Sequence, residues 1–360
     1  MEIKAKFVKP IKFEILFDSS EEAFLKRLTK KRYVILSDKK VTRLYSKKII
    51  PLLKSRNLYK GIITLNLSEE NRDFETIQKV CKYLCTKHVD SSFGLIVLGG
   101  GLVQEIGAFV SHVYYRGIQE VKIPTTIVSM TDCIFDGKAS LNIGGHKSKV
   151  GIFTFPSIVW IRPFFLKTLT NVQFREQFAE VVKDFFVFQR GDFTHFSDLL
   201  QKVIKSQDMR AIKEIISSDI KVKKSLFRGN YNENRFEATL FGHPVAYAIE
   251  SFSKFKINHN KALIAGLFFE GCLAKELGLI SLEELEKLIL SLKLMGIKGT
   301  ALFYINKSLP LIKQDKRQTS DNFCFFLPSK TKVKRILIKN KDFFDLANKI
   351  IKENKKILAI

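Results

Sequence analysis

Three consecutive glycines, Gly99–Gly101, form the most promising chemical feature of this chain. They follow the apolar run Phe93–Leu98, and a helical pattern begins near Val103. A strand, a glycine turn and a helix N-terminus can hold a pyrophosphate, because glycines permit close backbone approach and the helix end presents unpaired N–H groups. The GxGxxG pattern is incomplete, since Gln104 occupies the third glycine position, and a tight structural turn is the alternative.

Charged and imidazole side chains form a second group of candidates. Glu180 and Lys183 are close enough in sequence for a helix to present both on one face, where a solvated ion pair is the ordinary result. The chain has six histidines, and a histidine on a helix is usually a core or surface residue. The number of histidines alone therefore does not indicate a metal site.

The cysteines are scattered, and none forms a CxxC pair: Cys81, Cys85, Cys133, Cys272 and Cys324. This usage is typical of a reduced, cytoplasmic protein. Cys81 and Cys85 are one helical turn apart, and packing is favoured over a metal or redox role, because buried thiols behave as small hydrophobes.

The composition, with 46% hydrophobic and 27% charged residues in a chain of 360, is typical of a soluble globular protein of two domains. No apolar run is long enough for a membrane span, and the first residues alternate like a strand, so we expect neither a span nor a secretory signal. The net charge is +25, but the basic residues are spread along the chain without an RNA-binding or zinc-finger signature. We expect steering of anionic substrates and no dedicated nucleic-acid binding.

The order of the expected elements indicates the architecture. Up to Trp160, short apolar runs alternate with helical patterns, which predicts an α/β domain with a mostly parallel, Rossmann-like sheet. Within it, a polar loop is expected to precede Gly151. From Phe164 to Asn306 nearly everything has helical periodicity, so we predict an all-helical C-terminal domain, with domains at residues 1–165 and 166–360. Near the end of this second domain, the apolar run Arg335–Ile338 is a strand candidate.

Five segments together carry a resemblance to a known family. They are GGGLVQEIGAFVSHVYYRG, IPTTIVSMTDCIFDGKASLN, FAEVVK, FGHPVAYAIE and NHNKALIAGL. In order and approximate spacing they resemble the dehydroquinate synthase family of sugar-phosphate cyclases, and the resemblance extends from about Val34 to Leu327. It implies an N-terminal α/β domain that binds NAD, a C-terminal helical domain that binds a catalytic metal, a reaction in the cleft between them and a homodimer.

The resemblance implies a metal site and a cofactor site. It places Glu180, His243 and His259 as ligands of zinc or cobalt, and two neutral imidazoles with one carboxylate leave coordination positions open for a substrate. The residues that would contact NAD are Asp38, Glu69, Arg72, Gly100, Gly101, Glu105, Thr125, Thr126 and Asp132.

It also implies substrate-binding residues. The catalytic positions would be Lys138, Lys183, Lys221, Arg235 and Tyr247. The phosphate would be held by Arg116, Lys138, Lys147, Ser148 and Lys316, with Arg116 supplied by a neighbouring subunit. Several cations around a phosphate dianion form charge-assisted hydrogen bonds, which are about twice as strong as neutral ones.

The chain also departs from the family pattern. Tyr247 stands in place of a second histidine, and a phenol can donate a hydrogen bond but cannot act as a base near neutral pH as imidazole can. Other departures are Arg72 for lysine, Gln104-Glu105 for Gly-Asp, Ser148 for asparagine, and Leu240 with Thr239 where an asparagine is usual. These changes leave the three metal ligands intact.

The leading hypothesis is a cytoplasmic sugar-phosphate cyclase of the shikimate pathway that forms 3-dehydroquinate. The steps that the family implies are transient oxidation by NAD, phosphate elimination, re-reduction and intramolecular aldol closure. The alternatives are a related cyclase that uses a heptulose or hexose phosphate, an NAD- and metal-dependent alcohol dehydrogenase, and a non-catalytic family member.

Overall fold

A computed structural model describes residues 12–135, 137–144, 146–226, 237–297, 300–329 and 333–354. The chain divides into two compact units, Met1–Thr168 and Leu169–Ile360. The first unit extends slightly beyond the expected boundary at 165, because the Tyr45 hydroxyl bonds both Phe165 O (2.7 Å) and Thr168 Oγ1 (2.6 Å). These contacts keep the last turn of the first unit attached to it.

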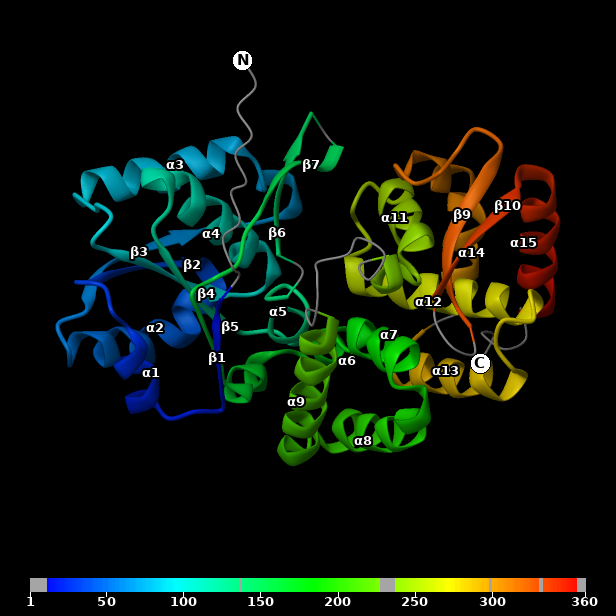
Figure 1. Cartoon of the computed structure of the whole chain (residues 1–360), viewed down its shortest axis with the longest axis horizontal. Coiled ribbons are helices and arrows are strands. Elements are labelled where there is room, and N and C mark those ends of the chain that lie inside the picture. Colours follow the sequence, from blue (N-terminus) through cyan, green and yellow to red (C-terminus); the bar gives the residue numbers. More distant parts are fainter. Residues whose placement is uncertain are drawn as a thin grey trace, which may run out of the picture. The chain divides into compact units, whose positions relative to one another are not determined.

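The first unit is built on a parallel sheet of six strands in the order β1-β8-β5-β4-β2-β3 (Figure 1). The strands are β1 Glu14–Phe17, β2 Tyr33–Asp38, β3 Tyr59–Leu65, β4 Gly94–Gly99, β5 Gln119–Pro124 and β8 Ile158–Ile161. Both β2 and β4 are almost entirely buried, as expected of central strands covered on both faces. The predicted α/β class with a parallel, Rossmann-like sheet is confirmed.

Helices cover the two faces of this sheet, with α3 and α4 on one side and α1 and α2 on the other (Figure 1). They are α1 Glu21–Arg27, α2 Lys39–Lys54, α3 Phe74–Thr86, α4 Gly101–Val113 and the short α5 Ile127–Thr131. Strand β2 leads to its neighbour β3 on one side, whereas β4 lies on the other side of β2. The strand order therefore reverses between β2 and β4, and in open α/β sheets ligands bind at such a point, outside the carboxyl ends of the strands.

The prediction of a polar loop before Gly151 is wrong. The segment forms an antiparallel hairpin of β6 Lys138–Ile143 and β7 His146–Phe153. Ala139 and Leu141 are fully buried on one side of β6, and the residues that alternate with them are polar, namely Lys138, Ser140 and Asn142. This alternation is the period-two signal of a half-buried strand, and the many polar residues hide it in the sequence.

The second unit is mostly helical and is organised around α12, which runs through its middle (Figure 1). Its helices are α6 Asn171–Glu176, α7 Ala179–Phe188, α8 Phe193–Ser206, α9 Met209–Leu226, α11 His243–Phe252, α12 His259–Glu276, α13 Leu282–Leu294, α14 Thr300–Ser308 and α15 Asn340–Asn354. Every residue of α12 from Ala262 to Ala274 is buried. A helix that is apolar on all sides has to be central, because every face must be covered.

The prediction that the second unit is all-helical is wrong, because the unit also contains two strands. It contains an antiparallel hairpin of β9 Asn322–Pro328 and β10 Val333–Lys339. The β9 sequence NFCFFLP is a short apolar run that periodicity cannot assign to a strand or a helix. Its burial against α12 and α15, with Phe323 and Phe325 against Phe343, decides in favour of the strand.

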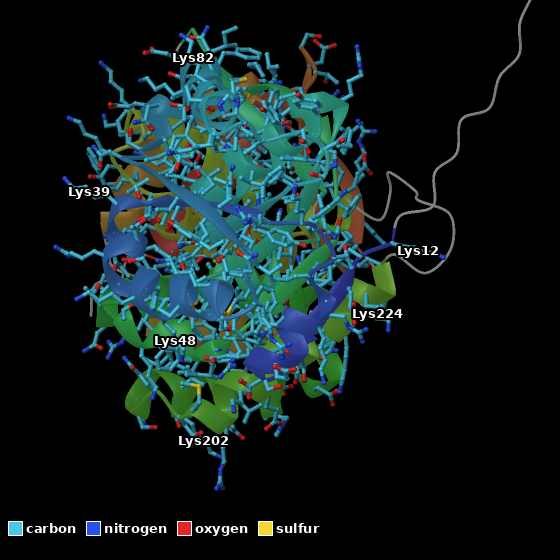
Figure 2. All side chains as sticks on the ribbon, turned by 90° about the vertical axis from the view of Figure 1, so that its left-hand side faces the viewer. Lys12, Lys39, Lys48, Lys82, Lys202 and Lys224 are labelled. Atoms are coloured by element: carbon cyan, nitrogen blue, oxygen red, sulfur yellow. The ribbon has the colours of Figure 1, made fainter. Side chains whose placement is uncertain are left out.

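The positive charge is dispersed over the surface. Labelled lysines point outward from separate elements in Figure 2, among them Lys39 and Lys48 on α2, Lys82 on α3 and Lys202 on α8. Within the part of the chain that the structure describes, no helix combines the length and the hydrophobicity needed to cross a bilayer.

Helix α4 can pack on the sheet only because residue 107 is glycine. A Cβ at Gly107 would lie 2.3 Å from Val97 Cγ2 on β4. Gly107→Ala should therefore destabilise the protein by roughly 1–3 kcal/mol despite the better helix propensity of alanine. We expect the thermal midpoint to fall by about 2–4 °C for each kcal/mol.

The matched control for this prediction is Gly191→Ala, because a Cβ at Gly191 meets no atom within 4 Å. Thermal unfolding followed by circular dichroism measures both variants. Equal midpoints for the two variants would contradict the assigned packing constraint.

Candidate metal centre and nucleotide-binding turn

Three helices of the second unit bring one acidic and two imidazole side chains together. Glu180 is buried in the first turn of α7, His243 is the first residue of α11, and His259 is the first residue of α12. Each histidine follows a residue that starts its helix: Gly242 adopts the left-handed conformation (φ 84°), and the Asn258 side chain caps α12 by accepting from Lys261 N. The structure therefore brings together all three residues proposed as metal ligands.

The geometry of this cluster fits a divalent metal ion. Glu180 Oε1 lies 3.4 Å from His243 Nε2 and 3.2 Å from His259 Nε2. The three ligand atoms all lie within 4.8 Å of one another. Two ligands of a tetrahedral zinc ion, each about 2.1 Å from the metal, are about 3.4 Å apart. The side chains present therefore need little movement to coordinate zinc or cobalt.

The other ring nitrogen of each histidine is fixed by an acceptor. His259 Nδ1 lies 2.6 Å from Glu250 Oε1, and His243 Nδ1 lies 3.4 Å from the carbonyl oxygen of Phe241. Both imidazoles thereby direct Nε2 towards Glu180, as metal-binding histidines do when an outer acceptor orients the ring. The sequence analysis missed Glu250, although it lies two helical turns after His243 on the same face of α11.

The pKa values at the cluster are set by the Glu180 carboxylate and the basic side chains around it. Burial disfavours ionisation of Glu180, but Lys183 and the two imidazoles outweigh it and hold the pKa of this carboxyl well below its usual range. Burial lowers the pKa of His243. Hydrogen bonds to Glu180 and Glu250 overcome burial at His259 and raise its pKa to about 9. The cluster therefore favours positive charge next to Glu180.

Close helix packing supports the position of His243. A Cβ at Gly266 on α12 would lie 2.0 Å from the carbonyl oxygen of Gly242, so only glycine permits this approach. The buried carboxylate of Glu270, one turn further along α12, accepts hydrogen bonds from Gly242 N (2.8 Å) and Val245 N (3.3 Å). It binds amides at the start of α11 that have no partner within the helix.

Two further predicted residues lie beside the ligands. The Lys183 ammonium contacts Glu180 Oε2, on the side opposite the histidines. The Tyr247 ring lies one turn after His243, with centroid distances of 5.4 Å to His243 and 6.4 Å to His259. Burial raises the pKa of Tyr247, so its hydroxyl stays protonated and can donate a hydrogen bond.

In the first unit, the glycine turn lies at the reversal point of the sheet. Thr125 N donates to Gly99 O (3.0 Å), and a Cβ at Gly100 would lie 3.1 Å from Thr126 Cγ2. Asp38 ends β2 and caps α2 by accepting from Val41 N. Among the residues that the structure describes, no side chain caps α4 at Gly100, so the N–H groups at its start can bind an anion. The turn therefore fits the pyrophosphate of a dinucleotide.

Gln104, the departure from the glycine pattern, has a structural role. Its side-chain amide donates to Val97 O and Gly99 O, both at 3.1 Å, and the residue is fully buried. It thus holds the end of β4 against the start of α4. Asp132, another predicted cofactor residue, is half-buried at the end of α5.

Arg72 joins residues that the sequence assigned to two different sites. Its buried guanidinium lies 2.5 Å from Glu105 Oε2, 3.2 Å from Glu69 Oε2 and 3.1 Å from Ser148 Oγ. It also bonds Ser140 and Asn142, which the sequence analysis did not identify. Ser148 was proposed as a phosphate ligand, whereas its hydroxyl here belongs to the Arg72 cluster and links the β6–β7 hairpin to α4.

The remaining predicted cations are not part of these clusters. Arg116 and Lys138 are exposed on the first unit, and Lys221 and Lys316 are exposed on the second. Arg235 and the side chain of Lys147 lie outside the described residues. On α9 the buried lysine is Lys223, two residues after Lys221, and it pairs with Asp184 at 2.7 Å.

The first unit has an α/β fold with a turn suited to a dinucleotide. The second unit is mostly helical and contains a cluster of two histidines and one glutamate. Residues 62–176 match the family description 3-dehydroquinate synthase N-terminal, and residues 177–318 match 3-dehydroquinate synthase C-terminal. The chain belongs to the 3-dehydroquinate synthase family, and the resemblance inferred from the sequence is confirmed.

Individual relatives agree with this assignment. The 3-dehydroquinate synthase of Prochlorococcus marinus (strain MIT 9215) is 30% identical over 320 residues, covering 87% of this chain and 88% of that protein. The 3-dehydroquinate synthase of Endomicrobium trichonymphae is 28% identical over 332 residues, covering 89% and 90%.

Solved structures share the fold. ValA, a 2-epi-5-epi-valiolone synthase from Streptomyces hygroscopicus subsp. jinggangensis 5008 with NAD+ and Zn2+ bound, has a TM-score of 0.85 at 18% identity over 98% of this chain and 100% of that chain. A 2-deoxy-scyllo-inosose synthase complexed with carbaglucose-6-phosphate, NAD+ and Co2+ has a TM-score of 0.78 at 17% identity, over 95% and 96%.

The contact between Glu250 and His259 yields a prediction about metal affinity. Glu250→Gln keeps an acceptor near His259 Nδ1 but removes the negative charge, and loss of such an outer partner typically weakens metal binding 10–100-fold. Zinc competition with a chromophoric chelator measures the dissociation constant. The control is Glu286→Gln, an exposed carboxylate on α13. Equal zinc affinities of the two variants would refute the role of Glu250.

Proposed function

We propose that the protein catalyses the conversion of a seven-carbon keto-acid phosphate into 3-dehydroquinate and inorganic phosphate. The observation that carries this proposal is the convergence of Glu180, His243 and His259 within metal-coordinating distance, in a chain of the 3-dehydroquinate synthase family. The reaction belongs to the shikimate pathway, and the proposed location is the cytoplasm.

Two cofactors are part of this proposal. Zinc or cobalt would be held by Glu180, His243 and His259. NAD would be held by residues of the first unit: Asp38, Gly100, Gly101, Thr125, Thr126, Asp132 and the cluster of Glu69, Arg72 and Glu105. When bound, the metal supplies a Lewis acid and NAD supplies a hydride acceptor that is restored within the turnover. The assignment is supported by the glycine turn at a helix N-terminus, which suits a pyrophosphate, and by the two imidazoles and one carboxylate, which suit zinc.

The chain's own residues would position the substrate. The Lys183 ammonium lies on the Glu180 carboxylate and can donate a further hydrogen bond to a substrate hydroxyl at the ligand cluster. The Tyr247 hydroxyl, next to both imidazoles, can donate to a phosphate oxygen. Proton removal near neutral pH would fall to a group other than this phenol.

The exposed and undescribed cations complete the proposed substrate site. Lys221 and Arg235 would bind the substrate carboxylate, and the phosphate would be bound by Lys138, Lys147, Ser148 and Lys316 together with Arg116 from the second subunit of a homodimer. Their support is the motif match to the family. A phosphate dianion surrounded by several cations agrees with the excess of 61 lysine and arginine over 36 acidic residues.

Phosphate release tests the proposed function. Purified protein incubated with the seven-carbon keto-acid phosphate, NAD and zinc should release inorganic phosphate without net accumulation of NADH. His243→Ala should lower the rate by 10³-fold or more, because one of three metal ligands is lost. The control is His195→Ala, an exposed histidine on α8.

Other outcomes of this assay distinguish the alternatives. Phosphate release only from a heptulose or hexose phosphate would indicate a related cyclase, and net NADH accumulation would indicate an alcohol dehydrogenase. A protein that holds no zinc and shows no thermal shift with NAD would be a non-catalytic family member.

Tyr247 yields a separate prediction about turnover. In the described part of the chain its hydroxyl has no hydrogen-bond partner, so Tyr247→Phe should leave the thermal midpoint unchanged. The phosphate-release rate should fall roughly 10–100-fold, since a hydrogen bond to a charged group contributes about 1.5–3 kcal/mol. The control is Tyr304→Phe on α14. Full activity of the Tyr247 variant would show that the phenol takes no part in the reaction.

A further inference from the structure

Two buried charged residues near Lys183 have no role in the proposed metal, cofactor or substrate sites. Asp184 is the next residue of α7 and is fully buried, and Lys223 on α9 is 3% exposed. Helix α7 packs against α9 in the second unit. Asp184 Oδ2 and Lys223 Nζ are 2.7 Å apart and form a close, buried ion pair.

These charges connect the ligand cluster to α9 through a series of contacts. Glu180 presents Oε1 to the histidines and Oε2 to the Lys183 ammonium. The same ammonium lies 3.6 Å from Asp184 Oδ1, and the other oxygen of Asp184 contacts Lys223. Lys183 therefore lies between two carboxylates, and Lys223 partly neutralises the second one.

Stability alone does not explain this arrangement. The neighbouring positions Val181, Val182, Phe185 and Val222 are all buried and apolar, so α7 and α9 have hydrophobic contacts without the pair. Buried ion pairs can often be replaced by apolar residues with no loss of stability, because desolvation offsets the attraction between the charges. A buried pair next to a functional lysine thus calls for a functional explanation.

We propose that Asp184 and Lys223 are positioning residues for Lys183, an inference that rests on the proposed function. If Glu180 holds a divalent ion, its carboxylate would attract Lys183 less strongly. Asp184 provides a second anchor, so the ammonium keeps its place and direction. Lys223 balances Asp184, because an unneutralised carboxylate there would draw Lys183 away from Glu180.

This inference also separates the two lysines of α9 by role. Lys223 points inward to Asp184, whereas Lys221 is exposed and belongs to the proposed substrate carboxylate site. A helix turns by about 100° per residue, so residues two positions apart lie on nearly opposite faces. One helix can therefore place one lysine behind Lys183 and leave the other accessible.

Double-mutant analysis of the pair tests the proposal. Lys223→Met leaves Asp184 without its main partner, so the thermal midpoint should fall by roughly 5 °C or more and kcat for phosphate release by about tenfold, with KM nearly unchanged. The double variant D184N/K223M removes both charges. Its midpoint should return to within about 2 °C of the wild type, while kcat stays about tenfold low because Lys183 has lost its second anchor.

A second measurement is independent of turnover. Glu180 contacts Lys183 and is also a proposed metal ligand, so displacement of Lys183 should change the coordination of Glu180. The d–d absorption bands of cobalt-substituted D184N/K223M should therefore be shifted from those of the wild type. The control is E276Q/K349M, which removes a 2.6 Å ion pair between α12 and α15 and should keep wild-type kcat and bands.

The outcomes separate this proposal from the proposed function. A wild-type kcat or an unshifted cobalt spectrum in D184N/K223M would overturn the positioning role and leave the pair as a structural contact. Absence of phosphate release from the wild type would count against the proposed function, and the cobalt spectrum would then decide the positioning role alone.

Discussion

The second unit depends on the burial of one carboxylate. An ionised glutamate is stable away from water only when partners surround it, and Glu180 has two imidazoles on one oxygen and an ammonium on the other. The three helices that supply these groups must start and cross at defined places. Gly266 allows α12 to approach the start of α11, and Glu250 orients His259. The helix packing and the candidate metal site are therefore one constraint.

In the first unit, a buried cation is likewise surrounded by partners of opposite charge or by polar groups. The buried Arg72 guanidinium draws in Glu69 and Glu105, together with hydroxyl and amide groups of the β6–β7 hairpin. A lysine ammonium has three donors on one nitrogen and could not reach all of these acceptors at once, whereas the planar fork of arginine can. The hairpin is thereby fixed to α4, whose N-terminus is the proposed pyrophosphate site.

The departures from the family pattern have local explanations in the fold. Gln104 bonds two carbonyl groups at the end of β4, and the terminal nitrogens of Arg72 bond Glu105, Ser140, Asn142 and Ser148. Tyr247 lies against both imidazoles without displacing either from Glu180. These replacements leave the three proposed metal ligands together.

The sequence by itself determined the α/β class of the first unit, because strands and helices have different local periodicity, and its resemblance to a known family supplied the proposed metal ligands. The alternation of strands and helices predicted the parallel sheet, and the ordered segments around Glu180, His243 and His259 predicted the metal set. Only the tertiary structure decided that Ser148 joins Arg72, that Glu250 orients His259 and that Lys223 faces Asp184. These contacts join residues from different elements or turns, and their formation depends on how strands pair and helices pack, which periodicity does not encode.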